Sequence, residues 1–593
     1  MKNILKNQLL LVAYILMQPQ INAQDMFVKD NASVYVYVSN QYVFIKNDLE
    51  LNGPNSNFYL RKEGQLLQGT TGSGTNKGTG KLSVFQEGTV NNFQYNYWCS
   101  PVGNTATSNS TNTAFGISQL GRPITTTVTT PASILATNKY DGIANPLAIS
   151  SYWIYKFIIK SSYSDWAYVG STATINPGEG FTMKGTSGTD NTDIYGDEVQ
   201  NNPDGKHQRY DFRGKPNDGT IDIPVLEGEL TFTGNPYPSA IDLQAFLLNE
   251  SNCTGVAYFW EQDKTVNSHY IADYKGGYGS YSGDTDIYIP AVFYSYNGSG
   301  GEVIPGTSSS NNYQRRYSPI GQGFMIEGEN NGNVQMKNSY RVFVKEGVAN
   351  NSQFEKKANP KTVAPTAIIP QIRFNTTLDN GPISQMVLAF SPLSTEGVDR
   401  AMDALSPNDG PANNYFVINN NEYVIEVVPF DIDKKIAVGF RNYAQANYKI
   451  MVNEMLNIPE VTNVYLHDKI TNQYYDIKNC FYDLTLPAGT NNTQYEITFK
   501  NGTTLGTDKF VENNFEVYQN NTSKNVTVEN PMQKEITTYN LYDVVGRLIS
   551  SKTQLGTDLS YEFSTANLRD GIYIVKLTSS DKIEMGTKII VKN

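Results

Sequence analysis

The sequence predicts an all-β, multi-domain protein made of β-sandwich modules, with a short β-solenoid-like region near its N-terminus. Of the 593 residues, 12% are aromatic, including 40 Tyr, whereas only 17% are charged. Short runs of β-branched and aromatic residues alternate along the chain with Gly, Asn, Thr and Ser. The former favour strands and the latter favour turns, so helices are expected to be rare. The length allows about four domains.

The first residues, 1–23, have the pattern of a secretory signal peptide. Lys2 and Lys6 precede an apolar run at 9–16, and Ala23 offers a small residue at the cleavage point. The apolar run is too short to span a bilayer, which needs about 20 apolar residues. No later stretch is apolar enough either, so we expect no transmembrane segment in the mature chain.

Residues 24–89 are rich in closely spaced strand-like runs. Their links contain Asn and Gly, as in Asn52-Gly53-Pro54. This pattern predicts a few coils of a β-solenoid, with a small stacked sheet as the alternative. The runs lie at residues 34–38, 42–45, 49–51, 58–60, 66–67 and 82–85.

Residues 90–220 and 221–347 contain four motifs in the same order, so we interpret them as two copies of one β-rich module. Each copy is large enough to bury its own core. Phe181 and Phe324 are expected at equivalent buried positions, because each follows a Gly-x-Gly turn. The matching motifs are Trp98-Cys99-Ser100-Pro101 with Thr233-Gly234-Asn235-Pro236, Ala114-Phe115 with Ala245-Phe246, Tyr152-Trp153 with Phe259-Trp260, and Gly178-Glu179-Gly180-Phe181 with Gly321-Gln322-Gly323-Phe324.

The second copy also predicts a short helix. Ser239 and Asp242 have the spacing of a capping box. Its apolar face is expected to consist of Leu243, Phe246 and Leu247.

The tail at residues 513–593 consists of short strand-like runs separated by Asp, Asn and Gly, which predicts a small β-sandwich. It resembles the type A C-terminal sorting domain of cargo proteins of the Bacteroidetes type IX secretion system. One departure is Gln519-Asn520-Asn521, where that family usually has Pro-Asn-Pro. The residues that carry the resemblance are Phe515, Gly546, Arg547, Asp570, Gly571 and Tyr573.

This resemblance implies an export route for the protein and a location outside the cell or on its surface. The type IX secretion machinery becomes an expected partner. The protein is expected to be secreted, either extracellular or attached to the outer cell surface.

A proline-containing linker at 348–370 leads to a further module at 371–502. Residues 395–404, Pro429-Phe430-Asp431 and residues 465–469 resemble the β-sandwich module that often precedes the sorting domain in large flavobacterial surface proteins. This resemblance implies a scaffold and names no ligand.

Motifs for catalysis are missing from the sequence. The three histidines, His207, His269 and His467, lie in different modules, and no nucleophile elbow, zinc helix or phosphate loop occurs. We therefore predict no catalytic, cofactor-binding or metal-binding residues and a protein that is not an enzyme. A carboxylate-pair glycosidase stays open, since its two acids can lie far apart in sequence.

Two further observations limit the ligands. The formal net charge of −11 argues against nucleic acid, which is bound chiefly through Lys and Arg. The Asp-containing turns at 201–205 and 407–410 offer oxygens to Ca²⁺, but Asp, Asn and Gly are also ordinary turn residues. Calcium is thus the lesser alternative.

The cysteines are Cys99, Cys253 and Cys480, with no CxxC pair. A bridge between Cys99 and Cys253 stays open, and buried free thiols are the favoured interpretation.

The segment at 270–317 holds many tyrosines among Gly, Ser, Asn and Asp, and not all of them are expected to reach one core. Exposed rings with polar tips suit glycans or surface proteins as partners, although they also stabilise loops. The candidate ligand-binding residues are Tyr274, Tyr278 and Tyr281.

Together these features predict an exported, non-catalytic protein that is displayed on the cell surface or released. Its expected role is adhesion, as an adhesin, or a part in surface structure. The alternative is a polysaccharide-active enzyme or a glycan-binding accessory protein.

Overall fold

The computed structural model describes residues 22–69, 74–196, 200–297, 301–309, 313–347, 352–353, 368–378, 381–502, 515–544, 546–581 and 584–593. Residues 1–21 of the predicted signal peptide and most of the predicted linker at 348–370 lie outside the described residues. Strands make up 52% of the structure and helices 4%, which confirms the all-β fold class.

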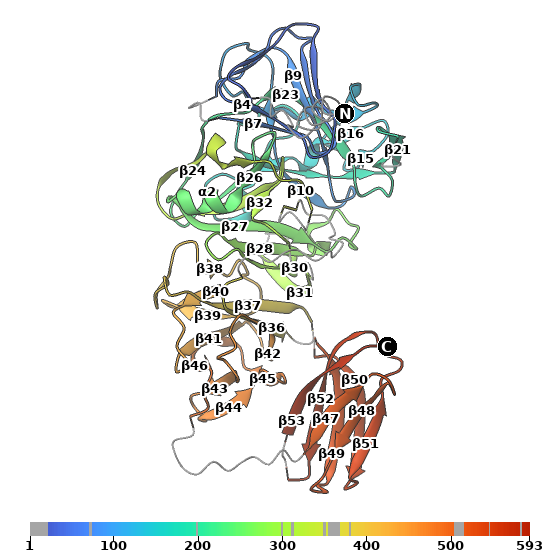
Figure 1. Ribbon diagram of the computed structural model, residues 1–593, viewed down its shortest axis with the longest axis vertical. Coiled ribbons are helices and arrows are strands. Elements are labelled where there is room, and N and C mark those ends of the chain that lie inside the picture. Colours follow the sequence, from blue (N-terminus) through green and yellow to red (C-terminus); the bar gives the residue numbers. More distant parts are fainter. Residues whose placement is uncertain are drawn as a thin grey trace, which may run out of the picture. The chain divides into compact units, whose positions relative to one another are not determined.

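The chain forms two compact units (Figure 1). The first comprises Met1–Ala257 and Tyr313–Val363, and the second comprises Tyr258–Asn312 and Ala364–Asn593. This division differs from the predicted module at 221–347, because the middle of that module belongs to the second unit.

The N-terminal region is a β-solenoid. Its strands form three parallel sheets, with the orders β1-β4-β7, β2-β5-β8 and β3-β6-β9, so each successive coil adds one strand to every sheet. This arrangement confirms the solenoid prediction. The strands are β1 (Asn22–Ala23), β2 (Met26–Val28), β3 (Ser33–Val36), β4 (Tyr42–Ile45), β5 (Leu49–Leu51), β6 (Asn57–Leu60), β7 (Gln65–Gln68), β8 (Lys77–Gly78) and β9 (Lys81–Glu87).

The solenoid shares its core with the region that follows it. Leu60 lies in register between Val36 and Val84, and all three side chains are buried. The same hydrophobic cluster contains Trp98 and Phe181. The predicted boundary at residue 89 therefore does not separate two cores.

Among its described residues, the rest of the first unit is built from short strands, 3₁₀ turns and the helix α2. Strands β12, β23 and β9 belong to the same sheet, so this part continues the solenoid. The elements used below are β10 (Tyr95–Cys99), β12 (Leu120–Pro123), η2 (Ser151–Trp153), β19 (Gly180–Lys184), β23 (Arg209–Pro216), β24 (Ile221–Val225), β25 (Leu230–Gly234), β26 (Ala240–Asp242), α2 (Leu243–Asn249), β27 (Cys253–Gln262), β33 (Gly323–Gly328) and β34 (Gly332–Met336).

Two strand pairs have the same register and support the internal duplication. In β10 and β19, Trp98 lies opposite Phe181. In β25 and β33, Thr233 lies opposite Phe324. Both phenylalanines are fully buried, so the two residues occupy equivalent places, as the sequence predicts.

The two pairs also contact each other reciprocally. The Cys99 amide donates to the Gly321 carbonyl at 2.9 Å, and the Thr233 hydroxyl donates to the Gly178 carbonyl at 2.7 Å. Both glycines have positive φ, +83° for Gly178 and +78° for Gly321. Each copy thus places the same left-handed turn against the strand of the other copy.

Two of the four matched motifs lie in different structures. Trp153 ends the 3₁₀ turn η2, whereas Trp260 lies inside the long strand β27. Phe115 forms a bridge with Ile175, whereas Phe246 lies in the helix α2. The copies have diverged outside the paired strands, because insertions and helix signals alter the local structure.

Helix α2 forms where the sequence predicts it, but its N-cap differs. Asp242 is the N-cap, and its carboxylate accepts from the Ala245 amide at 3.0 Å. Ser239 lies before the helix, where its hydroxyl accepts from Arg341 at 3.2 Å. The predicted capping box from Ser239 is therefore wrong, since Asp242 itself has the cap geometry. The predicted apolar face is confirmed: the buried residues are Leu243, Phe246 and Leu247.

In the second unit, residues 371–498 form one eleven-stranded sheet around a single core. Its main path runs β44-β43-β46-β41-β39-β40-β37-β36-β42-β45, and β38 pairs with β40. Phe374, Phe416 and Phe440 are fully buried in this core. The strands are β36 (Gln371–Leu378), β37 (Ile383–Phe390), β38 (Ala404–Leu405), β39 (Ala412–Ile418), β40 (Asn421–Val428), β41 (Lys435–Asn442), β42 (Ala446–Leu456), β43 (Tyr465–Asp468), β44 (Gln473–Asp476), β45 (Tyr482–Leu486) and β46 (Gly489–Thr498).

The segment Tyr258–Asn312 packs against this sheet within the second unit. Ser282 donates from its hydroxyl to the Ala401 carbonyl at 2.6 Å, and Arg373 donates to the Tyr288 carbonyl at 3.3 Å. Its strands are β28 (Gly276–Ser282), β29 (Ile287–Ile289), β30 (Val292–Tyr296) and β31 (Glu302–Ser308).

The tail is a β-sandwich of two sheets, with the orders β47-β48-β51 and β50-β49-β52-β53. Its own core contains Phe515, Val526, Tyr539 and Val575. The strands are β47 (Glu516–Asn520), β48 (Asn525–Glu529), β49 (Ile536–Asp543), β50 (Leu548–Gly556), β51 (Ser560–Ser564), β52 (Gly571–Ser579) and β53 (Glu584–Val591).

Cys99, Cys253 and Cys480 are buried free thiols, as predicted. Within the part of the chain that the structure describes, no helix has the length and apolar character needed to cross a membrane.

Candidate functional site

The predicted sorting-motif residues gather at one end of the tail's four-stranded sheet. Asp543, at the end of β49, lies opposite Tyr573 in β52, and Gly571 lies opposite Val591 in β53. The turn after β49 contains Gly546, which has φ of +74°. Segments twenty or more residues apart in sequence therefore meet at this end.

Side-chain contacts hold this end of the tail together. Asp543 accepts from the Arg547 amide at 2.9 Å and from its guanidinium at 3.0 Å. Asp570 accepts from the Asn593 amide at 2.8 Å, and Tyr573 donates to the Arg569 carbonyl at 3.1 Å. Phe515 is buried in the core of the tail. These residues shape turns and strand ends, so their contribution here is structural.

The candidate ligand-binding tyrosines have different surroundings. Tyr281 is only 1% exposed, and its hydroxyl donates to Asp286 at 2.8 Å. The ring of Tyr278 packs edge-on against Trp260, with centroids 5.2 Å apart. Tyr274 is half-buried and ends the 3₁₀ turn at Ile271–Asp273. Tyr281 thus offers no surface to a ligand, whereas binding by Tyr274 and Tyr278 stays a prediction.

The tyrosines of this segment do not all reach one core, as the sequence predicts: Tyr270 is 78% exposed, whereas several others are buried. Tyr281, Tyr288 and Tyr294 are all buried. Tyr294 donates to the Ala412 carbonyl of the eleven-stranded sheet at 3.3 Å. The second unit's module at 371–502, which is distant in sequence, thus also packs against this segment.

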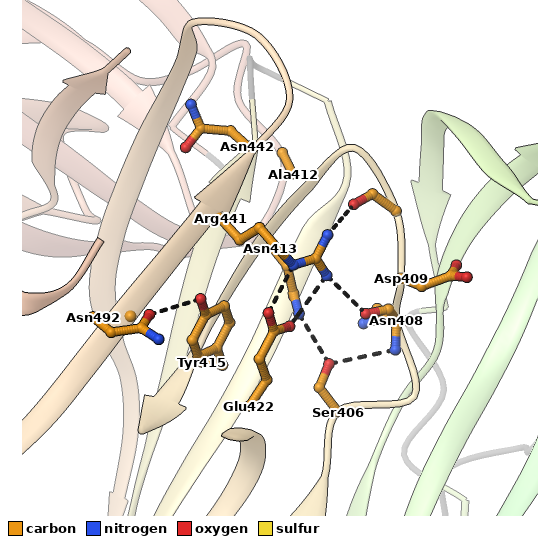
Figure 2. Close-up of polar contacts among 12 residues, drawn as sticks. Ser406, Asn408, Asp409, Ala412, Asn413, Tyr415, Glu422, Arg441, Asn442 and Asn492 are labelled. Carbon is orange, nitrogen blue, oxygen red and sulfur yellow. Dashed lines mark hydrogen bonds and ion pairs between the residues drawn. The ribbon is translucent and has the colours of Figure 1, made fainter. Parts of the chain in front are cut away.

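A polar cluster surrounds Arg441 in the second unit (Figure 2). Arg441, near the end of β41, donates from Nε to Glu422 Oε1 at 2.7 Å and from Nη2 to Oε2 at 3.1 Å. It also donates to the carbonyls of Gly410 at 2.8 Å and Asn408 at 3.2 Å. Burial lowers the pKa of Arg441, but the hydrogen bonds to Glu422 outweigh this effect and raise it overall.

Amide and hydroxyl groups complete the cluster. The Asn413 amide donates to Glu422 Oε2 at 2.8 Å and to the Ser406 hydroxyl at 3.0 Å. Nearby, the Tyr415 hydroxyl donates to Asn492 at 2.9 Å, as Figure 2 shows. The guanidinium is already bonded to a carboxylate and two carbonyls, so the cluster anchors the loop before β39 rather than awaiting a substrate anion.

The loop at 407–410, singled out for calcium, lies in this cluster. Two of its carbonyl oxygens, those of Asn408 and Gly410, already accept from Arg441. Across the described residues, no three His, Cys, Asp or Glu side chains group in a way that could hold a metal ion. In the other turn, Asp204 contacts the His207 ring at 2.8 Å.

A pair of carboxyl groups borders the cluster. The Asp409 amide donates to Glu302 Oε2 at 3.1 Å. Burial, and then the adjacent Asp409 carboxylate, raise the pKa of Glu302 to about 9. A pKa this high favours the protonated form of Glu302 at neutral pH.

Asp403, in the segment 395–404, and Glu426, in β40, form a second carboxyl pair. Asp403 accepts from the Val427 amide at 2.7 Å and from the Asp399 amide at 2.6 Å. Glu426 is 8% exposed, and its Oε2 has no hydrogen-bond partner among the residues described. Burial is the main cause that raises the pKa of Asp403 to about 7 and that of Glu426 to about 8.

The histidines have structural contacts. His467 lies 2.8 Å from Glu496 through Nδ1 and 3.1 Å from Asn472 through Nε2. Its ring stacks on Tyr474 with a centroid distance of 4.0 Å. The His467 ring thus has a defined place in the sheet and is not beside a Ser or Cys nucleophile in these contacts.

A shallow surface pocket of about 330 Å³ lies beside the start of β46. Its lining includes Asn442, Ile470, Pro487, Asn491 and Gln494, and it contains no carboxylate or aromatic ring. Amide groups around an apolar floor suit hydrogen bonding to a neutral ligand rather than acid–base chemistry.

Sequence reasoning missed the Arg441 cluster and both carboxyl pairs. Their members come from strands and loops that are far apart in the chain, so no local spacing marks them. The local signals are the turn at 407–410, which supplies Asn408, Asp409 and Gly410, and the acidic segment at 395–404, which supplies Asp403.

Comparison with known families agrees with the geometry of the tail. Residues 516–592 match the family model described as secretion system C-terminal sorting domain. The protein is a cargo of the type IX secretion system of Bacteroidetes, and it is exported to be secreted or attached to the cell surface. The secretion machinery is therefore a partner.

A second model covers most of the remaining chain. Residues 129–499, more than half of the 593 residues, match the model described as domain of unknown function (DUF8693). The chain belongs to this family. A search of curated proteins finds no match to it.

Proposed function

We propose that this exported protein is a non-catalytic adhesin or surface-structure protein. The observation that carries the proposal is that the charged groups of the Arg441 cluster make contacts that hold the fold together. Arg441 and Glu422 bind each other and a loop, and the shallow pocket beside β46 has no titratable side chain. The described contacts build and brace β modules, which is the task of a scaffold that presents surfaces.

Binding is assigned to glycans or to other surface proteins. Tyr274 and Tyr278 are partly exposed and combine an aromatic face with a polar tip. The amide-lined pocket offers hydrogen bonds to neutral hydroxyl groups. Both features suit a neutral sugar chain more than a charged ligand.

The alternative, a polysaccharide-active enzyme, has one observation in its favour. Glu302 has a raised pKa and lies beside a second acidic residue, Asp409, and a carboxyl group with a raised pKa is what a general acid requires. However, retaining glycosidases separate their two carboxyl groups by roughly 5 Å to admit the sugar. Here the Asp409 backbone amide donates a hydrogen bond to Glu302 Oε2 at 3.1 Å, so this carboxyl oxygen is already bonded within the protein.

The test compares turnover and binding in the same preparation. Purified protein is incubated with a panel of plant, algal and bacterial polysaccharides while reducing ends are measured, and it is applied to a glycan array. We expect array binding without turnover. Hydrolysis that disappears in Glu302→Gln or Asp409→Asn would overturn the proposal and support the enzyme.

A double variant locates the binding surface. Tyr274→Ser with Tyr278→Ser is expected to weaken attachment to the bound glycan or cell surface while the protein stays folded. Tyr281→Ser is the comparison, since it removes a buried ring and is expected to lower stability. Unchanged attachment of the double variant would move the binding site elsewhere.

A further inference from the structure

One outward-facing residue of the sorting domain is buried where an isolated sandwich would expose it. In β52, Val575 and Leu577 point into the core of the tail. Side chains alternate along a strand, so Ile574 points to the opposite face. Ile574 is nevertheless 0% exposed, whereas Ile572, on the same face of the same strand, is 44% exposed.

The module at 371–502 covers Ile574. A separate hydrophobic cluster joins Ile574 with Met451, Cys480 and Phe481, all of them buried. The ring of Tyr542, in the neighbouring strand β49, meets Phe481 edge-on with centroids 5.0 Å apart. This cluster is a small apolar core that neither part has alone.

Polar contacts surround the apolar cluster. Lys588 in β53 donates from Nζ to the Val452 carbonyl of β42 at 2.6 Å, and burial lowers the pKa of Lys588. Lys576 lies 3.8 Å from the Asp483 carboxylate. Burial is also the main cause that raises the pKa of Cys480 to about 11.

Close approach of the backbones adds shape specificity. A side chain at Gly586 would overlap Cβ and Sγ of Cys480. A Cβ at Gly546 would lie 2.8 Å from Lys449 Cδ. Glycine at 586 therefore lets the module approach, whereas at Gly546 the flexible Lys449 side chain could move and the φ of +74° is the reason for glycine.

We propose that the 371–502 module carries a binding site for the sorting domain of its own chain, centred on Cys480 and Phe481 and filled by Ile574. The tail is then a docked module, not a freely tethered one. While it is docked, the part of this outward face around Ile574 is covered, whereas Ile572 and Ile590 stay exposed. Any partner that contacts the covered part must first displace the module.

Alkylation of Cys480 tests the proposal in the full-length protein. The rate of modification by N-ethylmaleimide is followed by peptide mapping in the wild type and in Ile574→Asp, Gly586→Val and Ile572→Asp. Undocking exposes the thiol, so we expect at least about a tenfold faster reaction in the first two variants. Ile572→Asp is the matched control and is expected to react at the wild-type rate.

Two internal checks separate undocking from unfolding. Cys99 and Cys253 are fully buried in the first unit, so their slow modification should not change. Hydrogen exchange of the β49 and β52 amides should stay slow, because these strands belong to the tail's own sheet. Gly586→Val removes nothing from the tail's core, which keeps the test decisive if Ile574→Asp unfolds the tail. Rapid modification of wild-type Cys480, or unchanged rates in both variants, would overturn the proposal.

Discussion

At the scale of single residues, Gly178 and Gly321 show how the two copies of the repeat constrain each other. Each has a positive φ and offers its carbonyl to the strand of the other copy. A side chain in this backbone region is strained whatever space surrounds it. The glycines are therefore required by conformation as well as by contact.

We expect Gly178→Ala and Gly321→Ala each to lower the free energy of unfolding by roughly 1–2 kcal/mol. The loss should be larger for Gly178, whose added Cβ would meet Ile221 at 3.0 Å and Ile223 at 3.1 Å. Urea unfolding followed by tryptophan fluorescence measures both. Gly116→Ala is the control, because Gly116 lacks a positive φ and its nearest neighbour would be 3.7 Å away. Equal stability of all three variants would contradict this role.

The carboxyl pair of Asp403 and Glu426 makes stability depend on pH. Their folded-state pKa values of about 7 and about 8 lie above those of the unfolded chain, which are about 4. From about pH 4 to pH 8 the folded state holds protons that the unfolded state releases, so stability falls as pH rises. The charged neighbours are Asp399 and Glu396, which oppose ionisation, and Lys434, which favours it.

The measurement is the urea midpoint between about pH 5 and pH 8.5. We expect the wild-type midpoint to fall across this window and the fall to be smaller in Glu426→Gln, which cannot ionise. A Glu426→Gln profile identical to that of the wild type would show that this carboxyl does not contribute.

At the scale of elements, the duplicated strand pairs place large side chains in matching positions. Phe181 in β19 and Phe324 in β33 are both fully buried and face equivalent partners. Phe181 contacts Phe115, with ring centroids 5.7 Å apart, and Phe324 contacts Phe246 at 6.4 Å. The repeat has thus preserved its central strands while the surrounding elements changed.

Phe181→Ala and Phe324→Ala are each expected to cost about 3–5 kcal/mol, the usual range for a buried phenylalanine. Chemical denaturation provides the values. Exposed Tyr168, 48% accessible, serves as the control, since Tyr168→Ala should cost far less. A small effect for one phenylalanine alone would show that the two positions are not energetically equivalent.

At the scale of the whole molecule, the tail has its own core and its own pair of sheets. The solenoid, in contrast, shares its core with Trp98 and Phe181. Removing the solenoid would therefore unfold part of the first unit, whereas removing the tail leaves the cores of the first unit and of the eleven-stranded sheet intact and opens only the small cluster around Ile574. Deleting the solenoid therefore tests folding of the first unit, whereas deleting the tail tests the role of the tail itself.

Deletion of residues 514–593 is expected to retain the protein in the periplasm, because the sorting domain directs export. Cell fractionation and surface labelling provide the readout. The full-length Ile590→Asp variant is the control, since Ile590 is 65% exposed and its replacement should leave export normal. Normal surface display of the truncated chain would contradict this assignment.

The sequence by itself determined the all-β class, the solenoid, the paired phenylalanines and the sorting tail. These features follow from local signals: strand-forming runs, turn glycines and a tail motif. The N-cap of α2 shows the limit of such signals, because the sequence pattern indicated a capping box starting at Ser239, whereas in the structure Asp242 is the N-cap.

Only the tertiary structure decided which surfaces are covered. Tyr281 and Tyr294 are buried because a sheet more than a hundred residues away packs on them, and Ile574 is buried by the module at 371–502. Arg441 joins Glu422 through strand pairing that no spacing encodes. Burial depends on contacts between segments distant in the chain, so a residue's own neighbours in sequence cannot determine it.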